Sequence, residues 1–78
     1  MQDDLLDRIT TDPRILGGKP IVRGMRVSVE QIVKALAAGV PAEDLLADIP
    51  VLESDDIRAC LEYAARVVEE HSHFTMAG

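Results

Sequence analysis

The fold is decided by residues 28–50, which read SVEQIVKALAAGVPAEDLLADIP. Ser28 and Gln31 have the spacing of a capping box, in which side chains and backbone N–H groups at the start of a helix satisfy one another. Apolar residues then recur at every third or fourth position, as they do along the buried face of a helix. This pattern predicts a helix over residues 29–38.

Two further helices follow from the residues that break the chain. Gly39 suits the left-handed conformation that ends a helix, and Pro41 suits the start of the next one, over residues 41–48. Ser54 then precedes a third apolar periodicity, which predicts a helix over residues 55–70. The buried face of this third helix is expected to contain Ile57, Leu61, Ala64 or Ala65, and Val68.

The chain before residue 28 has a different pattern. Two β-prone runs, Lys19–Val22 and Met25–Val29, flank the dipeptide Arg23-Gly24, which predicts a tight hairpin or a sharp corner. Three helices with short connections form the skeleton of helix-turn-helix domains. We therefore expect one domain over residues 1–78. It should be a mainly α, three-helix, homeodomain- or winged-helix-like bundle with a short β-turn element at about residues 8–27 and a flexible tail at 72–78.

Charge is distributed unevenly along the 78 residues, whose net charge is −6. Residues 8–34 carry six bases against two acids, whereas residues 35–78 carry nine acids against two arginines. An acidic chain is a poor non-specific DNA binder, because neutralisation of phosphates supplies most of that affinity. A locally basic third still permits a focused contact with an anionic partner.

The basic third therefore supplies the candidate DNA-binding residues, which are Arg14, Lys19, Arg23 and Arg26. Duplex DNA is favoured over single strands, because two aromatic residues cannot form a base-stacking platform. The start of the third helix is acidic at Asp55 and Asp56, so the basic segment should contribute more to DNA binding than that helix does. The alternative is that Arg23 and Arg26 pair with carboxylates of their own chain or of a second chain in a dimer.

Enzymatic constellations are not evident. Cys60 lies on an apolar stripe without an activating neighbour, which indicates a structural thiol. His71 and His73 stand near a chain end without further metal ligands, so we expect no metal, no cofactor and no catalytic residue. The single thiol, the acidic N-terminus and the lack of a long apolar run predict a cytoplasmic protein with no membrane contact.

The motifs Ile9-Thr-x-Asp12-Pro13, Gly17-Gly18-Lys19-Pro20 and Arg23-Gly24-x-Arg26 resemble the signature of the bacterial and archaeal domain of unknown function 433 family. The later segments Leu45-Leu46-x-Asp48-x-Pro50 and Asp56-Ile57-Arg58-Ala59 continue the resemblance, which covers about residues 8–66. Two positions differ from the usual pattern, since Pro41 replaces a Ser or Thr helix cap and Met25 replaces a Thr.

The resemblance implies an antitoxin-like regulator of a type II toxin–antitoxin module, which binds a PIN-like toxin and promoter DNA. PIN-like nucleases hold metal with clustered acids, so Arg58 and Arg66 become candidate partner-binding residues. The alternative is a protein-interaction or dimerisation module with no DNA-binding role. A small core and no disulfide also predict a homodimer, for which the β-prone edges Lys19–Val22 or Met25–Val29 offer one route.

Overall fold

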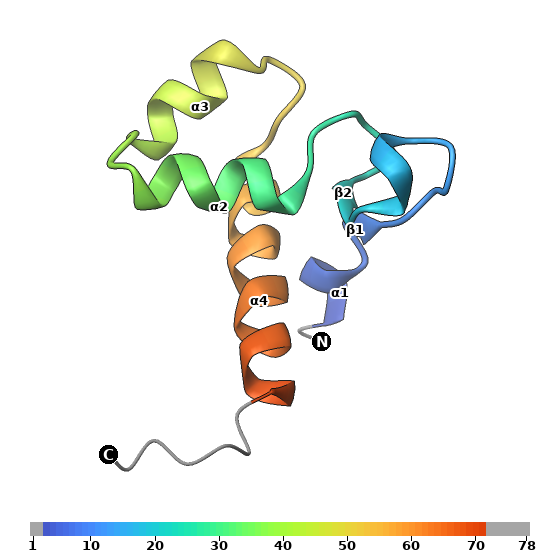
Figure 1. Cartoon of the computed structure of the whole chain (residues 1–78). Helices are drawn as coiled ribbons and strands as arrows, with labels where there is room; N and C mark the ends of the chain where they lie inside the picture. The colour runs from blue at the N-terminus through green and yellow to red at the C-terminus, as the bar shows by residue number, and fades with distance from the viewer. Residues whose placement is uncertain (1–2, 72–78) are drawn as a thin grey trace, which may run out of the picture.

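The computed structural model describes residues 3–71 and is mainly helical (Figure 1). Its principal helices are α2 (Val29–Ala37), α3 (Ala42–Asp48) and α4 (Ser54–Glu70). Helix α2 crosses the N-terminal half of α4, and α3 lies beyond α2 (Figure 1). The predicted fold class, a small helical bundle with a short N-terminal β element, is confirmed. The expected tail at 72–78, which includes His73, lies outside the described residues.

The helix ends follow the local signals in the sequence. The Ser28 hydroxyl accepts a hydrogen bond of 2.9 Å from the backbone N–H of Gln31 and so caps α2. Gly39 has a φ of 94°, a conformation that side chains with a Cβ rarely adopt, and it ends the helix there. Pro41 is the N-cap of α3 and not its first helical residue.

The predicted corner brings the two β-prone runs together, and a further strand that the sequence did not indicate pairs with the first run. Strands β1 (Ile9–Thr10) and β2 (Ile21–Val22) are antiparallel and bracket a loop with a short 3-10 turn at Leu16–Gly18. The second predicted run, Met25–Val29, contributes one isolated bridge, between Ser28 and Ile21. Pairing stops there because Ser28 already begins the capping of α2.

The corner between β2 and that bridge is tight. The Met25 N–H donates to the Val22 carbonyl at 2.8 Å, and the two residues between them, Arg23 and Gly24, have φ values of 45° and 73°. Positive φ at both central positions is typical of type I′ hairpin turns. Glycine adopts this conformation readily, whereas an arginine needs compensating interactions to remain in it.

An additional short helix, α1 (Asp3–Leu6), was not predicted from the sequence, and it packs against α4. The core lies where α2, α3, α4 and β2 meet. It consists of apolar and thiol side chains that are at most 7% exposed: Val22, Val29, Ile32, Leu45, Leu52, Ile57 and Cys60.

The sequence placed α4 and the buried Ile57 correctly, but not the helix cap or the rest of the buried face. Its N-cap is Glu53, and Ser54 is already helical. Leu61 and Val68 were expected to be buried, but they are 47% and 67% exposed. Helix α4 runs past the end of the bundle, so the apolar stripe of its C-terminal half has no core to enter (Figure 1).

Candidate functional site

A buried carboxylate at the start of α4 organises the most extensive polar cluster among residues 3–71. The Asp56 side chain is completely buried and accepts four hydrogen bonds. Arg23 binds it in bidentate fashion, with Nε 3.0 Å from Oδ1 and Nη2 2.8 Å from Oδ2. Arg8 Nη1 lies 2.9 Å from Oδ1, and the backbone N–H of Glu53 lies 2.8 Å from Oδ2.

This cluster joins three parts of the chain. Arg8 precedes β1, Arg23 occupies the tight corner after β2, and Asp56 is the third residue of α4. Arg23 also donates to the Val51 carbonyl at 2.8 Å, and Arg8 donates to Glu53 Oε1 at 2.8 Å. The β element is therefore clamped to the N-terminus of α4 by charge-assisted hydrogen bonds, which are the stronger kind.

Electrostatics keep this carboxylate ionised. Burial alone raises the pKa of Asp56, but the hydrogen bonds from Arg23, the Glu53 N–H and Arg8 outweigh it and lower the pKa to about 2. These bonds make the cluster a structural clamp between the β element and α4.

The clamp determines what the predicted DNA-binding residues can do. Arg23 is held in it, as the alternative reading of the sequence proposed for this residue. Arg14 is 87% exposed, but its guanidinium donates two hydrogen bonds of 3.0 Å to the Asp12 carboxylate. These bonds lower the pKa of that carboxyl. Lys19 lies 2.8 Å from Glu30, whose pKa is lowered by Lys19 and then by Lys34.

Arg26 differs from the other three predicted residues. It is exposed, and within residues 3–71 it has neither a hydrogen bond nor an ion pair. The structure thus leaves the four predicted cations apart from one another. One is in the clamp, two are in exposed pairs, and one is unpaired within the described part of the chain.

The predicted partner-binding arginines lie on the outer face of α4. Arg58 pairs with Asp55 at 3.1 Å, and Arg66 pairs with Glu62 at 3.0 Å, both within the helix and both exposed. Exposed pairs of this kind contribute little and exchange partners at low cost. Arg58 and Glu62 also line a shallow hollow of about 280 Å³ together with the apolar side chains of Leu5 and Leu61.

The remaining chemistry of the described residues is sparse. The Cys60 thiol is fully buried, which raises its pKa to about 11 and makes it a poor nucleophile. No group of three metal-ligating side chains occurs among residues 3–71. None of the helices in this part of the chain is long and apolar enough to cross a bilayer.

Sequence reasoning missed Asp56, Glu53 and Arg8. The sequence showed Asp56 only as one of two acids at the start of the third helix, whereas the structure places it at the N3 position of a capping box whose N-cap is Glu53. The spacing of two acids three residues apart before an apolar stripe was the available signal. No local pattern indicated Arg8, whose bond to Asp56 spans 48 positions.

These features define a small, mainly helical domain in which a two-strand element is clamped to the longest helix. The chain belongs to the family described as "Protein of unknown function (DUF433)", whose model matches residues 9–64. The crystal structure at 2.00 Å resolution of a DUF433 member from Anabaena variabilis ATCC 29413 is similar, with a TM-score of 0.76 and 29% identity. The match covers 88% of this chain and 68% of that one.

A curated relative is the uncharacterized protein y4eO of Sinorhizobium fredii (strain NBRC 101917 / NGR234). It is 43% identical over 56 residues, which are 72% of this chain and 25% of the relative. This chain therefore spans about a quarter of the length of that protein. The family relationship establishes the fold and leaves the function to be argued from the surface.

Proposed function

We propose that this protein acts through protein–protein contact, as an antitoxin-like interaction module that binds a PIN-like partner on the outer face of α4. The observation that carries the proposal is the composition of this face. It presents Leu61, 47% exposed, beside Arg58 at one hollow, with Arg66 farther along the helix, and the ion pairs of both arginines are exposed and local. An apolar centre flanked by exchangeable cations suits an acidic partner surface.

The basic segment supports the same choice. Arg23 is bound to a buried carboxylate, and Arg14 and Lys19 each have a carboxylate of the chain within 3.0 Å. Arg23 can bind phosphate only by leaving the clamp, whereas the exposed pairs of Arg14 and Lys19 can exchange partners as those of Arg58 and Arg66 can. The protein-interaction reading therefore has more support than promoter binding by this segment. A homologous segment in a longer relative is consistent with a module that works beside other protein parts.

The outer face is tested with the purified product of a PIN-like gene encoded beside this chain, by titration calorimetry. Leu61→Lys should raise the Kd at least about tenfold, because it inserts a charge into the apolar centre of the interface. Arg58→Ala combined with Arg66→Ala should weaken binding and leave the fold intact. Ala47→Lys is the matched control, since it adds the same charge on the exposed surface of α3 and should leave the Kd unchanged.

Absence of binding by the wild-type chain, or equal affinity of Leu61→Lys and Ala47→Lys, would contradict this assignment. If the nuclease binds but remains fully active, the protein is an interaction module and the antitoxin role is contradicted. Far-UV circular dichroism of each variant separates lost contact from lost folding.

Promoter DNA is the second candidate partner, and Arg26 is the observation that favours it. This exposed cation is without an ion pair in residues 3–71, so it can meet a phosphate without displacing an acid. Mobility shifts of the upstream region at about 50 mM and about 200 mM salt measure the number of phosphate contacts. Arg26→Ala should lower the salt slope by about 1.

Lys19→Ala should have a smaller effect on DNA affinity than Arg26→Ala, because Glu30 competes with phosphate for Lys19. Arg66→Ala, on α4, serves as the control and should leave the slope unchanged. If no shift is seen at the lower salt concentration, with or without the protein partner, the module has no DNA-binding role.

A further inference from the structure

The C-terminal half of α4 is an apolar surface with an uncovered side. The stripe that is buried at Ile57 and Cys60 continues one and two turns later through Ala64, Val67 and Val68. Helix α2 crosses α4 above this point, and α1 lies along one side of the lower half (Figure 1). The stripe therefore leaves the core of the monomer while keeping its apolar character.

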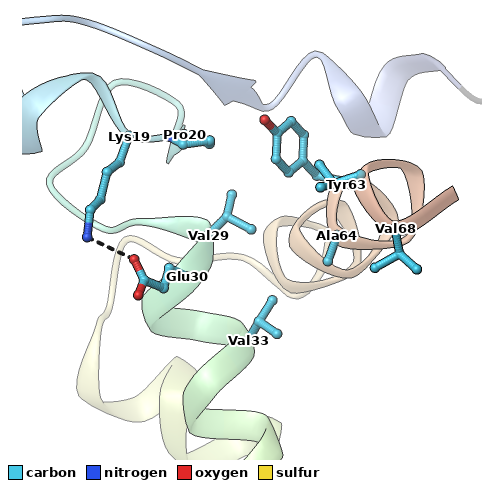
Figure 2. A pocket seen from close by; sticks show the side chains of 9 residues that line it. Lys19, Pro20, Val29, Glu30, Val33, Tyr63, Ala64 and Val68 are labelled. Atoms are coloured by element: carbon cyan, nitrogen blue, oxygen red, sulfur yellow. Dashed lines mark hydrogen bonds and ion pairs between the residues drawn. The ribbon is translucent and has the colours of Figure 1, made fainter. Parts of the chain in front are cut away.

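The stripe forms one wall of a groove of about 300 Å³. Figure 2 shows Val29 and Val33 of α2 facing Ala64 and Val68 of α4, with Pro20 and Tyr63 at one end. The Lys19–Glu30 pair closes the rim beside α2 (Figure 2). The groove thus has an apolar floor, a charged rim on the α2 side and a projecting valine on the α4 side.

We propose that this groove is occupied by the same face of a second copy of this chain, in a two-fold dimer. In a two-fold interface the same patch meets itself, so each protrusion must find its own recess. This face contains both. Val68, which is 67% exposed, projects beside the recess that Val29 and Val33 line. A second copy in the antiparallel orientation places its Val68 over the partner's recess and receives the reciprocal contact.

The charges around the groove have the same self-complementary arrangement. On the α2 side, Lys19 and Lys34 share the single acid Glu30, which leaves one net positive charge. The last turn of α4 is acidic at Glu70 and contains no basic residue, and therefore has the opposite sign. Two antiparallel copies bring each acidic helix end towards the basic rim of the other. A partner of uniformly acidic or basic surface would match one side and be repelled by the other.

Helix energetics also favour a covered groove. Most helical stability in proteins comes from tertiary packing, and the residues from Ala65 to Glu70 are all exposed in the monomer. A domain of this size also buries too little of its own surface to be more than marginally stable. Pairing of the two grooves would bury apolar side chains in the C-terminal half of α4, which is largely exposed in the monomer, and so would stabilise that part of the helix.

Of the two β-edge routes to a dimer, the one through Lys19–Val22 is closed. Ile21 is fully buried and pairs with Thr10 of β1 on one side and bridges to Ser28 on the other. Strand β2 therefore has no free edge over Lys19–Val22 to offer a second chain. The α4 groove is an apolar surface that no element among the described residues covers.

The test is the mass of the purified full chain, without any partner protein, by light scattering and sedimentation equilibrium at micromolar concentration. The wild type should have twice the 8.5 kDa chain mass. Val68→Lys should raise the dimer Kd at least tenfold, because it places two like charges in a two-fold apolar contact. The side chain is already mostly exposed in the monomer, so the fold should survive this substitution.

Ala65→Lys is the matched control, because it adds the same charge on the same helix outside the groove, and it should remain dimeric. A monomeric wild type at about 100 µM overturns the proposal. So does a dimer that Val68→Lys leaves as tight as the wild type. Because only this chain is present, these outcomes are independent of whether a PIN-like protein or DNA binds.

Discussion

Replacing Asp56 by alanine is expected to destabilise the domain by about 3 kcal/mol, a large fraction of the stability of a chain of this size. The substitution removes four hydrogen bonds at once. It leaves the guanidinium groups of Arg8 and Arg23 side by side without their shared counter-ion, and it removes the capping bond to the Glu53 N–H. Urea denaturation followed by circular dichroism measures the loss of unfolding free energy. A variant that is unfolded without urea would also agree with the expected destabilisation.

Asp55→Ala is the matched control for this experiment. Asp55 is the adjacent acid in the same helical turn, but its side chain is 50% exposed. Its removal costs the exposed pair with Arg58, a longer contact of 3.9 Å with Arg8 and a favourable charge at the helix N-terminus, together about 1 kcal/mol. Equal destabilisation by the two substitutions would show that the clamp is no stronger than a surface contact.

Arg23 should respond to substitution in a way that separates its backbone from its side chain. Both Arg23→Ala and Arg23→Gly lose the bidentate bond to Asp56. Glycine also removes the backbone strain of a residue with a Cβ at positive φ. Arg23→Gly should therefore have a higher urea midpoint than Arg23→Ala. The arginine occupies a conformation suited to glycine because its side chain completes the clamp.

The fold was predictable where local rules decide the structure. Ser28, Gly39 and the spacing of apolar residues place α2 and its ends through interactions within a few positions of the chain. The tight corner at Arg23-Gly24 was predicted for the same reason, since turn chemistry is local. The partner of β2 was not predictable, because β1 lies about a dozen positions away across a loop.

The clamp and the exposed end of α4 were beyond local rules. The sequence shows that residues 8–34 are basic and that later residues are acidic, but not which arginine meets which acid over 33 or 48 positions. Likewise, the periodicity of α4 predicts an apolar stripe, but it does not show that the helix is longer than the bundle it crosses. Val68 has the pattern of a core residue and the exposure of a contact residue.

This distinction changes how the basic segment relates to function. A cluster of cations in the sequence indicates an anionic partner. In this structure three of the four predicted cations have a carboxylate partner within the chain, namely Asp56, Asp12 or Glu30. The basic segment is therefore mainly the means by which the β element is attached to an acidic helical body. Arg26 is the predicted DNA-binding residue to which this explanation does not apply.

Acid should weaken the domain in a pH range set by the clamp. The pKa of Asp56 is about 2 in the folded chain and lies near 3.8 without its partners. A carboxyl whose folded pKa is depressed contributes its full stabilisation above the unfolded pKa and loses it as the pH falls through the folded pKa. This group alone should therefore contribute about 2 kcal/mol at pH 5 and above, lost between about pH 4 and pH 2.

The contribution of Asp56 is separated from those of other carboxyls by comparing two variants. Urea unfolding of the wild type at several pH values between 5 and 2, at constant ionic strength, should show stability falling with acid. In Asp56→Asn the part of this slope that belongs to Asp56 should be missing. Asp12→Asn should retain that part, because Asp12 bonds the side chain and backbone N–H of Arg14 and has no contact with the clamp. Titration of the Asp56 carboxyl carbon by NMR gives the folded pKa directly. A midpoint near the ordinary value would mean that the two arginines do not hold this carboxylate, and the β element would then be attached to α4 by packing alone.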